Sequence, residues 1–135
     1  MDDLPPKDLF LQSVARCTAS AAFIPAFYDR FTSASDEIRA KFRFTDFEQQ
    51  NKALKRSLEM CAFAIAGTPE ALAELTARAK THDRDHLNIE PRFYDIWVDT
   101  IIETAAEYDD QWSDAIEAAW RRVLSHVVKH MIRKY

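Results

Sequence analysis

Residues 45–82, TDFEQQNKALKRSLEMCAFAIAGTPEALAELTARAKTH, contain two signals for the start of a helix, one on each side of a glycine. Thr45 is followed three residues later by Glu48, which is the pattern of a capping box. The second signal is Thr-Pro-Glu at 68–70, where a capping residue precedes a first-turn proline and an early acid. Between them lies Gly67, the one glycine of the chain and a natural helix terminator. The stretch therefore predicts two consecutive long helices that part at this glycine.

Each of these helices has one polar residue in its apolar stripe. On the first helix the stripe is Phe47, Gln50, Leu54, Leu58, Cys61 and Ile65. On the second it is Leu72, Leu75, Ala79 and His82, near which the helix should end. A helix earlier in the chain repeats the pattern with Ile24, Tyr28 and Phe31. Because a buried polar group without a partner costs about 1 to 3 kcal/mol, Tyr28, Gln50 and His82 should use their polar atoms inside the fold.

The rest of the chain also predicts helices and no strands. It is rich in Ala, Leu, Glu, Lys and Arg and has no Asn-Gly or Asp-Gly hairpin signal. Further helices are expected over 7–18, from about Ser20 through Phe31, over 35–41, over 91–108 and from Ser113 to the C-terminus, with a polar connector at 83–90. The fold class is therefore all-α, and 135 residues predict a single domain over 1–135.

Composition excludes several classes of function. A single glycine argues against phosphate-binding loops and dinucleotide folds, which need several. Cys17 and Cys61 have no Cys-x-x-Cys spacing, so a disulfide scaffold, a zinc ribbon and covalent c-type haem are not expected. A net charge of −4 argues against a nucleic-acid surface. No apolar run is long enough for a membrane helix and no signal peptide begins the chain, so we expect a cytoplasmic protein.

Two histidine pairs allow a metal site made from side chains alone. His82 and His86 are four residues apart, as are His126 and His130, so each pair fits one helix face. Neither pair has a His-Glu-x-x-His arrangement or a third ligand nearby. Zinc is thus the weaker reading, and a histidine at a helix end is more often a cap.

Read in order, the chain resembles the bacterial single-domain globins and the haem domain of flavohaemoglobins. The likeness is carried by Phe27-Tyr28-Asp29-Arg30-Phe31, Asp36-Glu37-Ile38-Arg39, Phe42, Gln50 with Leu54, Leu75 to His82, Ile89, Pro91, Tyr94 and Ala119-Trp120. It covers almost the whole chain from about residue 20. It implies a globin-like fold of about six to eight helices around a haem pocket.

The resemblance also implies a role for individual residues. By this likeness His82 is the iron ligand of haem b (iron protoporphyrin IX), Tyr28 and Gln50 are hydrogen-bond donors on the opposite, gas-binding side, and Leu54 is the apolar residue over the iron. Phe42 would pack against the porphyrin, and Tyr94 belongs to the same cofactor-binding set.

Three features of the chain qualify this assignment. The connector from His82 to Ile89 is longer than in the flavohaemoglobin pattern, which makes His86 a rival iron ligand. The glutamate with which flavohaemoglobins hold the proximal histidine has no counterpart at 130–135. Cations should lie at the pocket mouth for the haem propionates, and Arg43 and Arg84 are the candidates because both lie in connectors.

The function implied is reversible binding of dioxygen or another diatomic gas, NO or CO, as in oxygen transport. Nitric oxide dioxygenation or weak peroxidase-type activity would need an external reductase, because no reductase domain is present. The alternatives are a sensor or regulatory globin acting through a protein partner or dimer interface, and a plain helical interaction domain. Exposed Trp97 or Trp112 would favour the sensor. We expect a monomer or homodimer that binds neither nucleic acid nor membrane.

Overall fold

The computed structural model describes residues 4–65, 67–85 and 89–134, and within them the chain forms helices and no strand. The helices are α1 (Pro6–Thr18), α2 (Phe23–Ser33), α3 (Asp36–Lys41), α4 (Phe47–Ile65), α5 (Pro69–His82), α6 (Pro91–Tyr108) and α7 (Asp114–Arg133). The predicted all-α fold class is confirmed, and the bounds of α5 and α6 agree with those expected from their proline starts.

Side-chain caps explain where two of the helices begin. Ser35 accepts a hydrogen bond from the backbone N–H of Ile38 at 3.1 Å, and Ser113 accepts one from Ile116 at 3.3 Å. The capping box expected at Thr45 is wrong. Its backbone N–H instead closes a turn onto the carbonyl of Phe42, so the cap moves one residue on.

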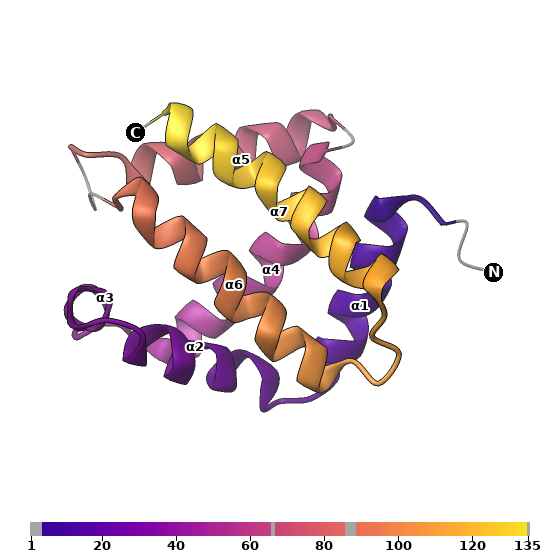
Figure 1. The fold of residues 1–135 in the computed structure, drawn as a ribbon. Helices are drawn as coiled ribbons and strands as arrows, with labels where there is room; N and C mark the ends of the chain where they lie inside the picture. Colours follow the sequence, from indigo (N-terminus) through magenta and orange to yellow (C-terminus); the bar gives the residue numbers. More distant parts are fainter. Residues whose placement is uncertain (1–3, 66, 86–88, 135) are drawn as a thin grey trace.

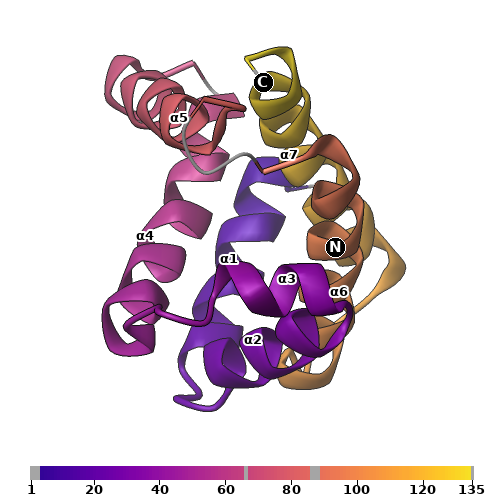
Figure 2. The ribbon, with the colours of Figure 1, turned by 90° about the vertical axis from the view of Figure 1, so that its left-hand side faces the viewer.

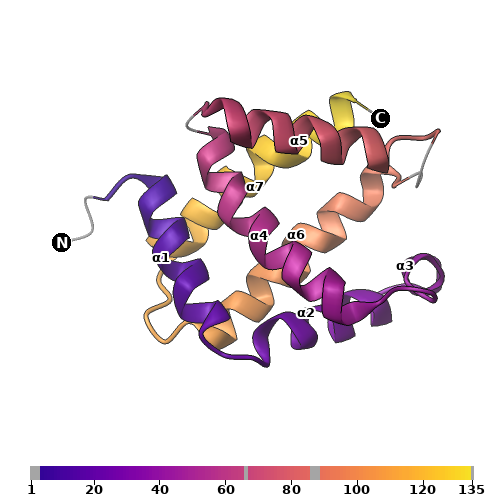
Figure 3. The same ribbon diagram turned by 180° about the vertical axis from the view of Figure 1, so that it is seen from behind.

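The actual cap of α4 is Asp46. Its Oδ1 accepts from the backbone N–H of Glu48 at 3.1 Å and of Gln49 at 3.5 Å. At the other end Gly67 has a φ of 80° and donates to the carbonyl of Ala64, which is the conformation that ends helices at glycine. This turn places α5 directly after α4 at an angle to it (Figure 3).

α4 and α5 pack on each other, and each also contacts other helices of the fold. α1 packs on α4 and α7, α2 packs on α6, and α5 packs on α4 and α7. Figure 1 shows α6 and α7 crossing in front of α4, with α5 above and α2 and α3 below. Figure 2, turned by 90°, shows α4 on one side of the molecule and α6 and α7 on the other.

A partly buried ion pair joins α1 to the turn between α6 and α7. The Asp109 carboxylate is fully buried and accepts from Arg16 at 2.5 and 2.9 Å and from the Ser13 hydroxyl at 2.6 Å. Trp120, the largest fully buried side chain, donates its indole N–H to Ser13 at 2.9 Å. Burial by itself would raise the pKa of Asp109, but the bonds from Arg16 and Ser13 outweigh it and hold this pKa below its ordinary value.

Candidate functional site

A cavity lies between the helices that the sequence singled out. Its volume is about 620 Å³, within the range of small-molecule and cofactor sites. Its lining includes Tyr28, Phe42, Gln50, Leu54, His82 and Tyr94, so every residue predicted to bind the cofactor faces the same space. Apart from a few polar groups the wall is aliphatic and aromatic, which is the surface that a large apolar ligand requires.

One side of the cavity carries a hydrogen-bonded pair from α2 and α4. Tyr28 is 5% exposed, and its Oη accepts a hydrogen bond from Gln50 Nε2 at 3.0 Å. Burial raises the pKa of Tyr28 to about 12, so the phenol stays protonated at neutral pH. Because the oxygen accepts from Gln50, the hydroxyl hydrogen is available to a molecule in the cavity.

Aromatic rings fix the position of Tyr28. Its ring centroid lies 5.7 Å from that of Phe42 and 5.5 Å from that of Phe47, while Phe42 also packs edge-on against Phe31 at 5.9 Å. Phe42 lines the cavity and Phe47 does not. Of the predicted apolar stripe of α4, Gln50, Leu54 and Cys61 line the cavity, whereas Leu58 is buried in the core. Phe47 is 37% exposed and packs on the outside of the aromatic group.

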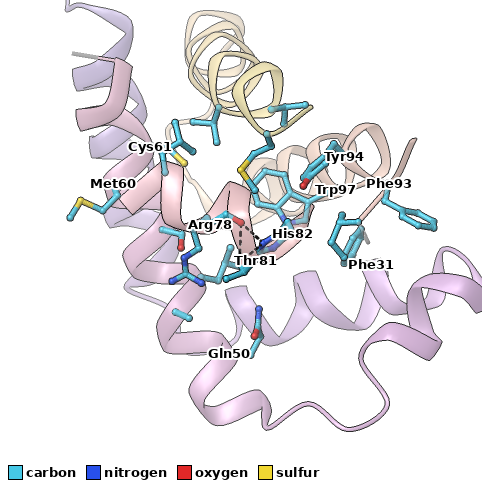
Figure 4. A pocket seen from close by; sticks show the side chains of 18 of the residues that line it. Phe31, Gln50, Met60, Cys61, Arg78, Thr81, His82, Phe93, Tyr94 and Trp97 are labelled. Atoms are coloured by element: carbon cyan, nitrogen blue, oxygen red, sulfur yellow. Dashed lines mark hydrogen bonds between the residues drawn. The ribbon is translucent and has the colours of Figure 1, made fainter. Parts of the chain in front are cut away.

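The other side of the cavity carries His82, the last residue of α5. Its Nδ1 lies 2.8 Å from the backbone carbonyl of Arg78 and 3.0 Å from the Thr81 hydroxyl, which itself donates to that carbonyl (Figure 4). A proton on Nδ1 satisfies the carbonyl, which leaves the lone pair on Nε2 for a metal. Burial, opposed by the bond to Arg78, lowers the pKa of His82 and favours the neutral imidazole that a metal needs.

The two ends of the connector that follows His82 lie next to each other. The backbone N–H of Ile89 donates to the carbonyl of His82 at 3.0 Å, and Ile89 lines the cavity. The two ends of the longer connector are thus joined by a backbone hydrogen bond. The rival ligand His86 lies outside the described residues.

Comparison with known proteins identifies this arrangement. The family model described as Globin matches residues 25–131. The chain belongs to the globin family. This globin is also similar to a Pseudomonas aeruginosa PAO1 protein whose crystal structure is described as structurally highly homologous to a human hemoglobin. The TM-score is 0.92 at 31% sequence identity, over 97% of this chain and 98% of that one.

No curated protein matches the chain. The resemblance to bacterial single-domain globins and the globin-like fold are confirmed, while neither comparison singles out the haem domain of flavohaemoglobins. Membership of this family implies haem as cofactor and a diatomic gas as ligand.

One residue of the apolar stripe expected on α5 lies at the surface instead. Leu72 is 41% exposed, so the inward stripe runs through Ala71, Leu75 and Ala79 to His82. Because α4 and α7 cover only that face of α5, the neighbouring position is left at the surface.

The cations at the cavity mouth also differ from those expected. Arg43 and Arg84 are exposed and are not among the described lining residues, and Arg43 lies over the exposed ring of Phe44 at 5.0 Å. Lys41 and Arg78 line the cavity instead. Arg78 had a readable signal, because it lies four residues before His82 and so shares its helix face.

Sequence reasoning also missed the wall formed by α6 and α7, to which Phe93, Trp97 and Met131 contribute.

In the described ranges no three His, Cys, Asp or Glu side chains converge on a common metal position. None of the described helices is both long and apolar enough to span a membrane.

Proposed function

We propose that this chain, as one globin domain over residues 1–135, binds haem b in the cavity with His82 as the iron ligand and reversibly binds dioxygen there. The observation that supports it best is the position of His82, whose Nδ1 lies 2.8 Å from the Arg78 carbonyl and whose ring lines the same cavity as the Tyr28–Gln50 pair. Figure 4 shows Gln50 from α4 and His82 from α5 both pointing into this space.

The residues around the cavity fit a flat apolar cofactor. Haem, when bound, supplies an iron that takes up a diatomic gas and shifts negative charge onto dioxygen. Tyr28 donates its hydroxyl hydrogen toward that charge, and Gln50 holds the Tyr28 oxygen in place. Leu54, which is 6% exposed, and Phe42 and Tyr94 exclude water from the same space.

Reversible binding is favoured over peroxidase-type chemistry by the partner of His82. A carboxylate on Nδ1 makes a histidine ligand more electron-donating, whereas the partner here is a backbone carbonyl. Oxidation of NO would in addition require electrons from an external reductase. Carriage of dioxygen by a cytoplasmic monomer or homodimer is therefore the proposal, with NO and CO as further ligands.

A sensor that docks through exposed tryptophans is less well supported. Trp97 lines the cavity and packs edge-on against Phe27 at 6.1 Å, and Trp112 packs against Trp120 at 6.2 Å. Both tryptophans are partly buried and pack against the core, so neither is the fully exposed side chain that such a sensor would use.

The visible spectrum tests the proposal directly. Protein purified from cells supplied with haem, or mixed with haemin, should be red, with a Soret band that shifts on reduction and again with CO. The haem should pass into acidified organic solvent, because no Cys-x-x-Cys-His is present to bind it covalently. A colourless protein that takes up no haemin would contradict the proposal while leaving the fold unchanged.

Tyr28→Phe should accelerate dioxygen release and autoxidation by about ten- to a hundredfold, because a hydrogen bond to a charged partner contributes about 1.5 to 3 kcal/mol. Carbon monoxide carries little charge, so its release should change far less. Stopped-flow and flash-photolysis rates for the two gases measure the difference. Gln50→Leu should act in the same direction more weakly, since Gln50 orients Tyr28. Equal rates in Tyr28→Phe and wild type would make Tyr28 a packing residue.

A further inference from the structure

We propose that Glu74 and Arg78 form a carboxylate-exchange latch at the cavity mouth, in which Arg78 binds a carboxylate of the entering tetrapyrrole and Glu74 is the internal anion that this carboxylate displaces. The inference rests on the proposed function, because it takes the cavity to be a haem site. It assigns Glu74 a role opposite in sign to that of Arg78.

The distances show that Glu74 holds two arginines loosely. Its Oε2 lies 3.6 Å from Arg56 on α4, and its Oε1 lies 3.7 Å from Arg78 on α5. Both separations exceed the 2.7 to 2.9 Å typical of a charge-assisted hydrogen bond. The surface pair of Arg30 and Glu107, by contrast, closes to 2.6 Å. Glu74 therefore bridges α4 and α5 without committing either guanidinium to a tight bond.

The latch lies on the cavity and not merely beside it. Glu74 and Arg78 both line the cavity, and the Glu74 side chain is only 26% exposed. Burial has the largest effect on the pKa of both His82 and Tyr28, and hydrogen bonding the next largest. The positive charge of Arg78 has a smaller effect and lowers the pKa of each. Figure 4 shows Arg78 on the same helix as His82, one turn earlier.

The arginine that lines the cavity indicates the class of ligand. Among the described residues, Arg56 and Arg78 share the carboxylate of Glu74, and of these two arginines only Arg78 lines the cavity. A planar guanidinium matches the two oxygens of a carboxylate. When a ligand carboxylate pairs with Arg78, Glu74 keeps Arg56 as its partner. The mouth therefore suits a flat apolar molecule that carries ionised carboxylates.

Iron-free protoporphyrin IX and its dimethyl ester test the latch without the iron–histidine bond. The two share one ring and differ in the charge of their carboxyl groups. Titrated into the haem-free chain by fluorescence, the diacid should bind Arg78→Gln about tenfold more weakly than wild type and Glu74→Gln severalfold more tightly. The ester should bind all three proteins alike. Arg78→Lys should recover part of the loss, and Arg43→Gln, an exposed arginine outside the cavity, is the matched control.

Three outcomes overturn the inference, and one separates it from the proposed function. If Arg78→Gln weakens the diacid and the ester equally, Arg78 acts by packing. If Glu74→Gln weakens the diacid as Arg78→Gln does, Glu74 positions Arg78 and does not compete with the ligand. If the diacid shows the expected pattern but haemin gives no Soret shift, the latch stands and the assignment of His82 falls. If neither porphyrin binds, both proposals fail.

Discussion

Replacing His82 with alanine is expected to abolish tight haem binding. Loss of a residue that only orients a metal ligand costs about 10- to 100-fold in affinity, and loss of the ligand itself should cost more. The imidazole is held by the carbonyl of Arg78 at 2.8 Å, and no other described histidine lines the cavity. Haemin titration followed at the Soret band, and transfer of haem to a scavenging apoprotein, measure the effect.

Added imidazole should restore a histidine-like spectrum to His82→Ala, because the substitution leaves space where the ring had been. His86→Ala is the matched control and should keep a near-normal spectrum. If His86→Ala loses haem while His82→Ala keeps it, the iron ligand is His86, and the bond between Ile89 and His82 has another purpose.

Replacing Asp109 with alanine is expected to cost roughly 1 to 3 kcal/mol of the free energy of unfolding, the range for leaving a buried polar group without its partner. The substitution leaves the Arg16 guanidinium without its carboxylate partner and removes the acceptor of the Ser13 hydroxyl. Since a domain of this size has about 5 to 15 kcal/mol in total, a large part of its stability should disappear. Urea unfolding followed by tryptophan fluorescence gives the value.

Asp110→Ala, at the exposed neighbouring position, should change stability little. The effect of Asp109→Ala should also depend on pH. The pKa of Asp109 is lower in the folded than in the unfolded chain, so its contribution is complete above the unfolded value of about 3.9 and declines as pH falls through the folded value. The two proteins should therefore differ less in acid. A difference that stays constant with pH would mean that the charge of Asp109 contributes nothing.

Local sequence signals were sufficient for the helices and for most of the site. Proline starts and serine caps depend on neighbouring backbone groups, so Pro69, Pro91, Ser35 and Ser113 mark helix starts without knowledge of the tertiary structure. Helical periodicity predicts that Gln50 and His82 face inward, and the family resemblance assigns Tyr28, Phe42, Leu54 and Tyr94 to the same site. All six residues line the cavity.

The features that were missed depend on contacts between distant parts of the chain. The Ser13–Asp109 bond joins residues 96 positions apart, and no local pattern indicates it. Arg43 and Arg84 were chosen because they lie in connectors, whereas Arg78 reaches the mouth along the face that carries His82. The spacing of Leu72 from Leu75 and Ala79 predicts an inward position, but Ala71 is buried in its place, and only the packing of α5 on α4 and α7 selects between these neighbouring positions.

Ile89 and His82 are joined by a backbone hydrogen bond, so the number of residues between them can change without changing the geometry of the site. A chain that leaves and re-enters the fold at one point can gain or lose residues there without moving either flanking helix, and each doubling of loop length costs only about 0.6 kcal/mol. Insertions and deletions among related genes should therefore concentrate between α5 and α6. The same segment is the place at which a peptide tag or a fused electron-transfer module can be inserted close to the cavity while His82 keeps its position.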